Sequence, residues 1–461
     1  MKSNLRSKTS RLLLLTALGT PLFVTKGLAD TTVRFATYNL SLNRNTQGGL
    51  ISDLSLPANP DAAQVNRIKQ AQTVAEIIQR NAPDVLLLNE FDYVGSTQAL
   101  GLFRNNFLEV GQDTLSTGSP AAPANFTQEF AAPSNTGLAS GFDLNNNGVA
   151  VTTPGAAGYG DDALGFGAFP GQFGMAFLSK YPIVASEIRT FQNFLWKDMP
   201  GALLPDDAST AAPMDFYSTA ELGVLPLSSK SHWDIPVNIN GDIVHILVSH
   251  PTPPVFDGPE DRNGRRNHDE IRFWKDYING ASYIYDDNGN LGGLSPSTRF
   301  VIMGDQNSDP LDGDSVVGSA DLLLQDPLVN ASLTPSSLGA VQAASLQGGI
   351  NNGHRNPSMS DTADFADTVP GNLRADYVLP SAAGLDPLGA GVFWPENSDT
   401  YFPLVGTFSF NNYFAGFPSS DHKLVFMDLS VNAVPEPSTC IVGALMAAAA
   451  GMVLRRRINR A

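Results

Sequence analysis

Short apolar runs that end at polar residues are the clearest pattern along the chain. Residues 32–40 alternate and are rich in β-formers, which predicts a first strand. Apolar positions then recur at helical spacing over residues 65–81, and the apolar run within residues 84–90 predicts a buried strand. Further strands are expected at residues 174–179, 233–239, 243–249, 299–303, 376–379 and 423–429, and an amphipathic helix at residues 268–278. Mixed strands with interspersed helices predict an α/β sandwich of two sheets covered by helices.

One long stretch, at about residues 101–171, lacks sustained periodicity and is dominated by Gly, Ala, Pro, Asn and Ser. We interpret it as an insertion in the domain rather than a domain of its own. Within it, residues 143–148 (Asp-Leu-Asn-Asn-Asn-Gly) resemble the first half of a calcium loop, but Pro154 stands where such a loop has a glutamate. A calcium site and an Asx-rich turn both remain open.

The two ends of the chain resemble export signals. Residues 1–29 combine a basic region, an apolar run and the small residues Gly27 and Ala29, which predicts a secretory signal peptide. Residues 433–461 contain Val-Pro-Glu-Pro, an apolar run and then three consecutive arginines at 455–457, and resemble the PEP-CTERM sorting signal of Gram-negative bacteria. An ordinary C-terminal membrane anchor is the alternative, because a span needs about 17–25 apolar residues. Both interpretations place the body, residues 30–432, outside the cytoplasm, that is in the periplasm, on the outer surface or secreted.

These signals imply the export and sorting machinery as partners, with transient or permanent membrane association through the C-terminal segment. Cys440 is the only cysteine and lies in that segment, so the body contains no intramolecular disulfide. Residues 30–437 hold 19 basic against 45 acidic residues, a formal charge of −26. Such a surface repels polyanions and argues against tight, processive DNA binding, although a metal site or a local basic groove can accept one phosphate. We expect a monomer.

Polar side chains gather where predicted strands begin or end, and a rigid scaffold presents such side chains to a shared cleft. Hydrolysis of a phosphoester needs a cation, a base for water and a group that stabilises the leaving oxygen. Carboxylates, an amide and imidazoles meet these needs. They occur here at residues 38–39, 89–90, 249–251, 304–310, 374–378 and 420–422.

In order, these groups read Asn, Glu, His, Gly-Asp-x-Asn-x-x-Pro, Asp-Tyr and Ser-Asp-His, a series that resembles the endonuclease/exonuclease/phosphatase superfamily, also called deoxyribonuclease I-like. Residues 174–183 (Gly-Met-Ala-Phe-Leu-Ser-Lys-Tyr-Pro-Ile) are similar to a strand of that family. The resemblance spans about Val33 to Leu429 and implies a four-layered α/β sandwich. It also implies that Glu90 is the principal metal ligand, supported by Asn39 and Asp421. Oxygen ligands of this kind suit Mg²⁺, Mn²⁺ or Ca²⁺ rather than zinc.

The same resemblance assigns the reacting groups. Asp305 would orient or deprotonate the attacking water, and Asn307 would bind a non-bridging phosphate oxygen. His422, held in one tautomer by Asp376, would act at the phosphate as acid, base or electrostatic clamp. His250 would contact the phosphate from the opposite wall and could protonate the leaving group.

Two segments near the expected cleft differ from familiar members of the family. Arg265 and Arg266 follow a stiff Pro-rich loop and could bind a second phosphate or a carboxylate, or could pair with neighbouring acids at a helix start. Lys230 and His232 precede a predicted strand and are further candidates for substrate contact. His245, inside a strand, and His354, in an Asn/Gly-rich loop, are expected to have structural or surface roles.

The leading hypothesis is therefore an exported, divalent-metal-dependent phosphoesterase that hydrolyses a phosphodiester by in-line attack of water. A small diester, a lipid head group and an extracellular nucleic-acid fragment are all compatible substrates. A phosphomonoesterase acting on sugar or inositol phosphates is the second enzyme hypothesis. A non-catalytic surface or matrix binding protein that keeps the fold is the third.

Overall fold

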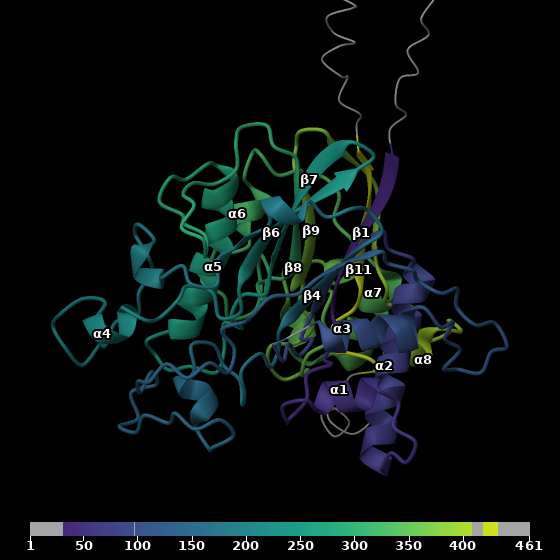
Figure 1. The fold of residues 1–461 in the computed structure, drawn as a ribbon, viewed down its shortest axis with the longest axis horizontal. Coiled ribbons are helices and arrows are strands. Elements are labelled where there is room, and N and C mark those ends of the chain that lie inside the picture. Colours follow the sequence, from purple (N-terminus) through teal and green to yellow (C-terminus); the bar gives the residue numbers. More distant parts are fainter. Residues whose placement is uncertain (1–30, 96, 408–417, 432–461) are drawn as a thin grey trace, which may run out of the picture. The chain divides into compact units, whose positions relative to one another are not determined.

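Two mixed β-sheets form the centre of the protein in the computed structural model (Figure 1). The structure describes residues 31–95, 97–407 and 418–431, so the expected signal peptide and sorting segment lie outside the described residues. The six-stranded sheet has the order β10 (Leu385–Val392), β11 (Val425–Val431), β1 (Thr31–Asn39), β2 (Val85–Asn89), β4 (Met175–Ser179) and β3 (Gln128–Phe130). The five-stranded sheet has the order β5 (Arg189–Thr190), β6 (His232–Ile239), β7 (Asp242–Ser249), β8 (Phe300–Asp305) and β9 (Asp376–Pro380).

Strand pairing brings polar residues of distant segments to one end of the sheets. β1 runs parallel to β2, with Asn39 opposite Asn89, and antiparallel to β11. In the other sheet β7 runs parallel to β8, and β8 pairs antiparallel with β9, with Asp305 opposite Asp376. The last residue of β1, of β2 and of β8 is thus polar, as the sequence pattern indicates.

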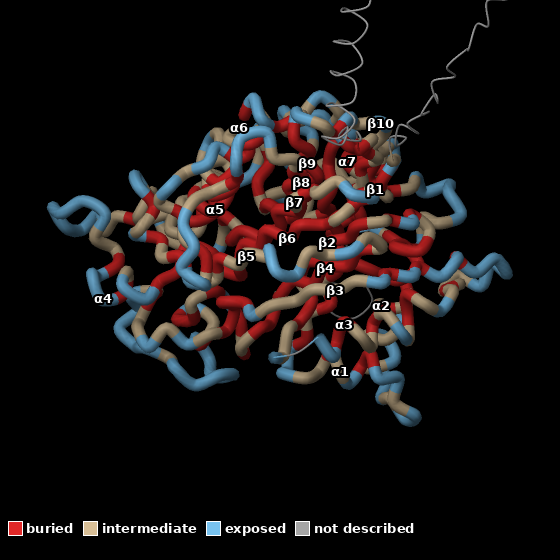
Figure 2. Tube along the Cα trace, turned by 45° about the horizontal axis from the view of Figure 1, so that its top comes forward, coloured by how far each residue is buried: buried red, intermediate tan, exposed pale blue. Residues whose placement is uncertain are grey.

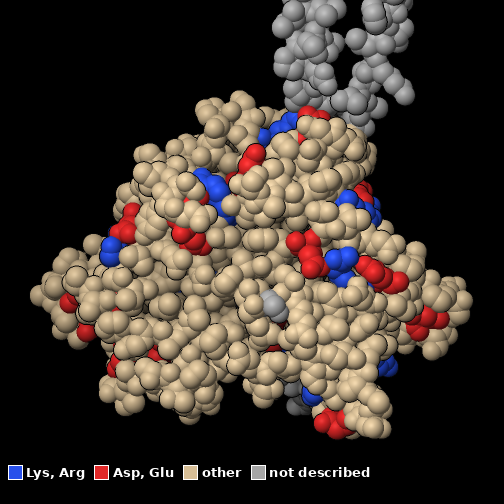
Figure 3. All heavy atoms as spheres, in the orientation of Figure 1, with Lys and Arg blue, Asp and Glu red and all other residues tan. Residues whose placement is uncertain are grey.

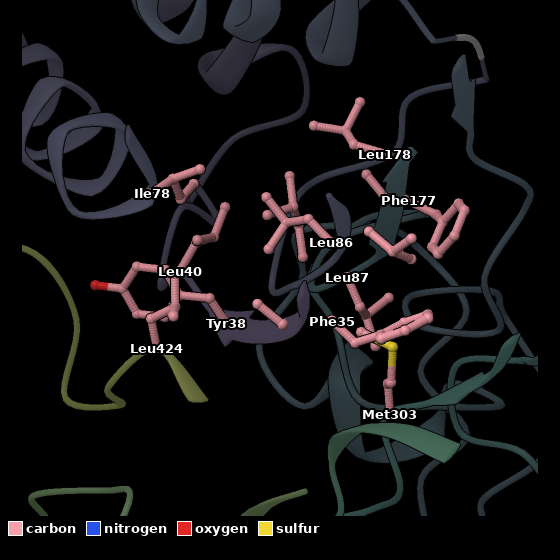
Figure 4. Packing of buried hydrophobic residues seen from close by; sticks show 14 of the residues in the cluster. Phe35, Tyr38, Leu40, Ile78, Leu86, Leu87, Phe177, Leu178, Met303 and Leu424 are labelled. Atoms are coloured by element: carbon pink, nitrogen blue, oxygen red, sulfur yellow. The ribbon is translucent and has the colours of Figure 1, made fainter. Parts of the chain in front are cut away.

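A continuous apolar core joins the two sheets. Phe35 of β1, Leu87 of β2 and Met303 of β8 are fully buried members of one cluster and lie close together in Figure 4. Burial follows the strands, and exposed residues concentrate in the peripheral loops (Figure 2). Burial of apolar surface contributes about 25 cal/mol per Å² to folding. This core, and not a disulfide, therefore stabilises the domain.

Helices cover the outer faces of the sheets. Val74, Ile77 and Ile78 of α2 (Ala62–Asn81) are buried in the same cluster as Phe35 of β1, whereas Trp274 and Ile271 of α5 (Arg262–Ile278) belong to a second cluster that includes Ile302. The other helices are α1 (Gly49–Leu54), α3 (Gln98–Phe103), α4 (Thr219–Leu222), α6 (Asp321–Leu324), α7 (Leu338–Gln347) and α8 (Phe402–Val405). Short 3₁₀ or π segments are η1 (Arg104–Leu108), η2 (Tyr159–Asp162), η3 (Ala185–Glu187), η4 (Trp196–Asp198), η5 (Gly349–Gly353) and η6 (Ser358–Ser360). The expected sandwich of two mixed sheets with flanking helices is confirmed.

The stretch at residues 101–171 is mostly loop, yet it adds β3 to the edge of the six-stranded sheet beside β4. Its Asp143 carboxylate accepts hydrogen bonds from the backbone N–H groups of Asn147 and Gly148. Asn145 and Asn147 each accept a hydrogen bond from the backbone N–H two residues on, which is the geometry of an Asx turn. Within the described ranges, no helix is long and apolar enough to cross a membrane.

Candidate active site

Asn39 links the ends of three strands. Its side-chain amide donates to Glu90 Oε1 at 3.2 Å and to Asp305 Oδ2 at 3.0 Å. Its carbonyl oxygen accepts from the backbone N–H of Ser41. Asp305 is fixed from the other side, because its backbone N–H donates to the Asn89 side chain at 3.3 Å. β1, β2 and β8 therefore present an amide and two carboxylates to the same point.

Two imidazoles complete this group. His250 Nε2 lies 3.4 Å and His422 Nε2 lies 3.6 Å from Asp305 Oδ2. His422 Nδ1 is held by Asp376 Oδ2 at 2.8 Å, and the same carboxylate oxygen accepts from the Thr362 hydroxyl at 2.8 Å. Asp376 thus orients His422, which faces Asp305 with its second nitrogen.

Asp421 and Glu90 line one cleft of about 1050 Å³. Asp421 Oδ1 accepts hydrogen bonds from the hydroxyls of Ser41 at 3.0 Å and Ser420 at 3.3 Å. Ser41 lies two residues beyond the end of β1, and Ser420 lies in the segment before β11. Asp421, the third expected metal ligand, therefore lies at the same cleft as Glu90.

Burial and mutual repulsion perturb the acids. Burial, with the charge of Asp421, raises the pKa of Glu90 to about 7. Burial also raises the pKa of Asp305 to about 6, although the charge of His422 acts against this shift. Shifts of this kind concentrate at functional sites.

The two imidazoles shift in opposite directions. Burial lowers the pKa of His250 well below its ordinary value, and the charges of Lys230 and His422 lower it further. Burial also disfavours the charged form of His422, but the charges of Asp376 and Asp305 and the hydrogen bond to Asp376 outweigh it and raise the pKa well above its ordinary value. At neutral pH the site therefore holds a neutral His250 and a charged His422.

Asn307 lies two residues beyond Asp305 in the left-handed region, with φ 50°. Its backbone N–H donates to Asp305 Oδ1 at 2.8 Å, and its side-chain amide donates to Pro251 O at 3.1 Å. Asparagine tolerates this conformation better than most residues do. The turn ties the Asp305 loop to the segment that carries His250.

The four candidate substrate-binding residues have different positions. Lys230 is buried, its ammonium donates to Pro251 O at 3.3 Å, and it lies near enough to Asp305 and Glu90 to sense their charges. His232 packs on Phe273 and uses its ring nitrogens on the Ser228 hydroxyl and on Glu270 O, the latter at 2.9 Å.

The guanidinium of Arg266 donates to three backbone carbonyls, Leu227 O and Leu164 O at 2.8 Å and Pro226 O at 2.9 Å. Arg265 donates to Glu260 O at 3.1 Å. Of the four candidates, the structure brings Lys230 to the group around Asp305, and it gives His232 and Arg266 partners within the fold. His245 pairs with Asp234 at 2.8 Å, and His354 bonds Pro370 O at 2.9 Å.

The donor set suits a hard divalent cation. Asp305 and Asp421 are buried carboxylates and Glu90 is half-buried. Burial raises the pKa of Glu90 and of Asp305, and a nearby cation would favour the charged forms of both. One further group, Asp305, Asp376 and His422, places three possible ligand atoms within 4.8 Å of one another. The hydrogen bond between His422 Nδ1 and Asp376 orients the ring and leaves Nε2 facing Asp305.

Several residues that support the site gave no signal in the sequence. Thr362, in a polar loop, fixes Asp376. Glu270 of α5 accepts from Ser229 N and Thr252 N, both at 2.6 Å, and so joins the segments of Lys230 and His250. Helical periodicity identified the buried face of α5, but it cannot show which backbone groups a buried acid will contact.

The structure is thus a two-sheet α/β sandwich with acids, an amide and two imidazoles at the strand ends. The model of the endonuclease/exonuclease/phosphatase family matches residues 36–422, and the chain belongs to this family. The PEP-CTERM protein-sorting motif matches residues 433–457 and marks an exported protein of a Gram-negative bacterium. No curated protein matches the sequence.

Solved structures with a similar chain path include an endonuclease/exonuclease/phosphatase from Beutenbergia cavernae, at 15% identity and TM-score 0.43, covering 88% of this chain and 73% of that one. A family protein from Leptotrichia buccalis is 15% identical with TM-score 0.38, covering 86% and 98%. Sphingomyelinase C from Streptomyces griseocarneus is 13% identical with TM-score 0.37, covering 86% and 99%.

Proposed function

We propose that this protein is an exported, divalent-metal-dependent phosphodiesterase. The observation that carries the proposal is the contact of one amide, Asn39, with both Glu90 and Asp305, while His250 and His422 lie 3.4 and 3.6 Å from the same Asp305 oxygen. A binding module has no need for a buried acid between two imidazoles of opposite protonation. Hydrolysis uses such a group directly.

Glu90, Asn39 and Asp421 would hold a Mg²⁺, Mn²⁺ or Ca²⁺ ion, which supplies charge neutralisation at phosphorus. Asp305, with its pKa of about 6, is ionised at pH 7. It orients the attacking water and accepts a proton from it. Charged His422 stabilises the negative charge that develops on the phosphoryl oxygens. Neutral His250 contributes a hydrogen bond from the other side of Asp305, and Asn307 contributes its amide.

Charge favours a small substrate over a polymer. Basic and acidic side chains are interspersed on the face drawn in Figure 3, which shows no extended basic stripe. Together with the formal charge of −17 for the whole chain, this favours a small diester or a lipid head group over long nucleic acid.

The test is hydrolysis of a chromogenic diester by the purified mature protein. Bis(4-nitrophenyl) phosphate should be cleaved with added Mg²⁺ or Mn²⁺, and excess chelator should abolish cleavage. 4-Nitrophenyl phosphate in parallel distinguishes a monoesterase, and plasmid DNA distinguishes a nuclease. Wild-type rates in an Asp305→Ala variant would contradict the proposal, because water activation would then lie elsewhere.

A further inference from the structure

The cleft that contains Glu90 and Asp421 has exposed aromatic walls. Phe166, from the Gly-rich insertion, is 65% exposed, and Phe256, from the loop after His250, is 89% exposed, and both line this cleft. Phe173 also lines it and lies 6.4 Å from Phe166 between ring centroids. Exposed apolar side chains gathered beside a catalytic group indicate a binding surface.

The insertion is fixed to the segments that carry the site. Asn135 N donates to Lys230 O at 2.8 Å, and Tyr93 N donates to Gly171 O at 2.8 Å. The Gln172 side chain donates to Arg44 O at 2.7 Å. A Cβ on Gly165, the residue before Phe166, would lie 2.0 Å from Ser229 O. These contacts hold the Phe166 segment close against the strand that follows Lys230.

Phe256 is held in an unusual backbone conformation. Its φ of 68° lies in the left-handed region, where a bulky residue is an outlier. The loop that contains it is anchored on α5, because the Asn263 amide donates to Val255 O at 2.7 Å. The ring is thus presented to the cleft by a restrained loop.

The cleft offers few charges to a polyanion. Its two arginines, Arg44 and Arg67, both donate to the carboxylate of Asp53. Three acids, Glu90, Asp161 and Asp421, line it as well. Apolar contact with the exposed rings is therefore a source of binding energy beyond the phosphate itself.

We propose that Phe166 and Phe256 bind a flat aromatic substituent of the substrate, so that the enzyme prefers diesters with such a group on phosphorus. The inference rests on the proposed function, since it places the phosphate at Glu90 and Asp421. Aromatic rings stack on flat groups and need no hydrogen bonds to do so. Such stacking fits an aryl or nucleobase substituent, and it fits a cleft wall that carries few charges. The insertion is thereby a specificity element of the active site.

Two diesters with the same leaving group test this. Bis(4-nitrophenyl) phosphate and methyl 4-nitrophenyl phosphate both release 4-nitrophenolate and differ only in the substituent that stays on phosphorus. The Phe166→Ala/Phe256→Ala variant should lose roughly 10-fold or more in kcat/KM on the aryl diester and less than about 2-fold on the methyl diester. Leu291→Ala, which removes a side chain 73% exposed outside the cleft, should change neither.

The outcomes separate the two proposals. Equal loss on both diesters would overturn the aromatic subsite and leave the hydrolase function standing. A loss seen only when substrate is presented on vesicles would assign the two rings to a lipid surface and overturn the inference as well. Wild-type protein inactive on both diesters would overturn the proposed function and, with it, this inference. If the double variant does not fold, Phe256→Ala alone, at an exposed position, gives the same comparison.

Discussion

The imidazole of His422 is held by the carboxylate of Asp376, whose Oδ2 lies 2.8 Å from Nδ1. The pairing fixes the ring and keeps it charged, because the negative charge of Asp376 raises the pKa of His422. The second nitrogen is left for Asp305, 3.6 Å away, and for substrate. Each half of this relationship can be tested.

Asp376→Asn should lower kcat by roughly 10²–10⁴-fold, because the amide can hold the wrong tautomer and no longer supports the charged ring. Removing the negative charge lowers the pKa of His422. The loss of kcat/KM on the basic side should therefore begin at a lower pH than in the wild type. A pH–rate profile of both proteins measures this, and an unmoved basic limb would exclude His422 as the titrating group.

Metal binding should stabilise the protein and depend on Glu90. Burial raises the pKa of Glu90 to about 7, so above this pH the folded protein without metal holds an unfavourable charge there. Added Mg²⁺ at 100 times its Kd should raise the unfolding free energy by about 2.7 kcal/mol. In Glu90→Gln the metal-dependent rise in Tm should disappear, while the metal-free Tm at pH 8 should equal or exceed that of the wild type. A full metal shift in Glu90→Gln would place the ion at other ligands.

The fold was largely predictable because long apolar periodicities dominate it. The strands before Asn39, Glu90 and Asp305 and the helices α2 and α5 follow directly from the spacing of apolar residues. β10 could not be found in this way. It contains Pro387, Gly389 and Gly391 and is an edge strand with a register shift between Pro387 and Gly389, a place where these residues are tolerated.

The site was predictable only where a residue type at a strand end implies chemistry. Asn39, Glu90, Asp305 and His422 meet because strand register brings their segments together, which the order of motifs indicated. His232 bonds the Ser228 hydroxyl and the Glu270 carbonyl of α5, whereas Arg266 bonds backbone carbonyls of loops. No pattern in the sequence encodes those contacts. The position of Phe166 at the cleft could not be predicted, because the Gly-rich segment at residues 101–171 lacks periodicity. Hydrogen bonds nevertheless order this segment in the structure.

The glycine before Asp305 should be indispensable for the site. Gly304 has φ 148°, and a Cβ there would lie 2.0 Å from Ser249 O. Gly304→Ala should therefore displace Asp305, lower kcat at least about 100-fold and reduce Tm. Gly289→Ala is the matched control, because Gly289 has φ 82° but no atom near the added Cβ, so it should cost only about 1 kcal/mol and no activity. If both changes had equal effects on kcat and Tm, the cause would be backbone strain at a positive φ and not displacement of Asp305.

One buried acid outside the site should make stability depend on pH. Burial, reinforced by the charges of Asp309, Asp312 and Asp364, raises the pKa of Asp361 to about 9. A raised pKa means that its contribution is fully present below the unfolded pKa near 4 and is lost as the pH rises toward 9. Asp361→Asn should thus raise stability only slightly at pH 4.5 and by on the order of 1–4 kcal/mol at pH 8. Parallel thermal melts at the two pH values measure this, and a gain of equal size at both would argue against titration.

Lys230 and Arg266, both buried cations, should respond in opposite ways to removal of their charge. Lys230 donates to Pro251 O and faces Asp305 and Glu90, and burial lowers its pKa, so its charge is costly to the fold. Lys230→Met should keep or raise Tm and lower kcat/KM by roughly 10²-fold, as expected for a cation that stabilises the phosphoryl group.

Arg266→Met leaves three carbonyls without a donor, at about 1–3 kcal/mol each, and should lower Tm sharply. At a temperature where Arg266→Met remains folded, its kcat/KM should be near that of the wild type, and a Lys230→Met variant with unchanged kcat/KM would remove Lys230 from the substrate site.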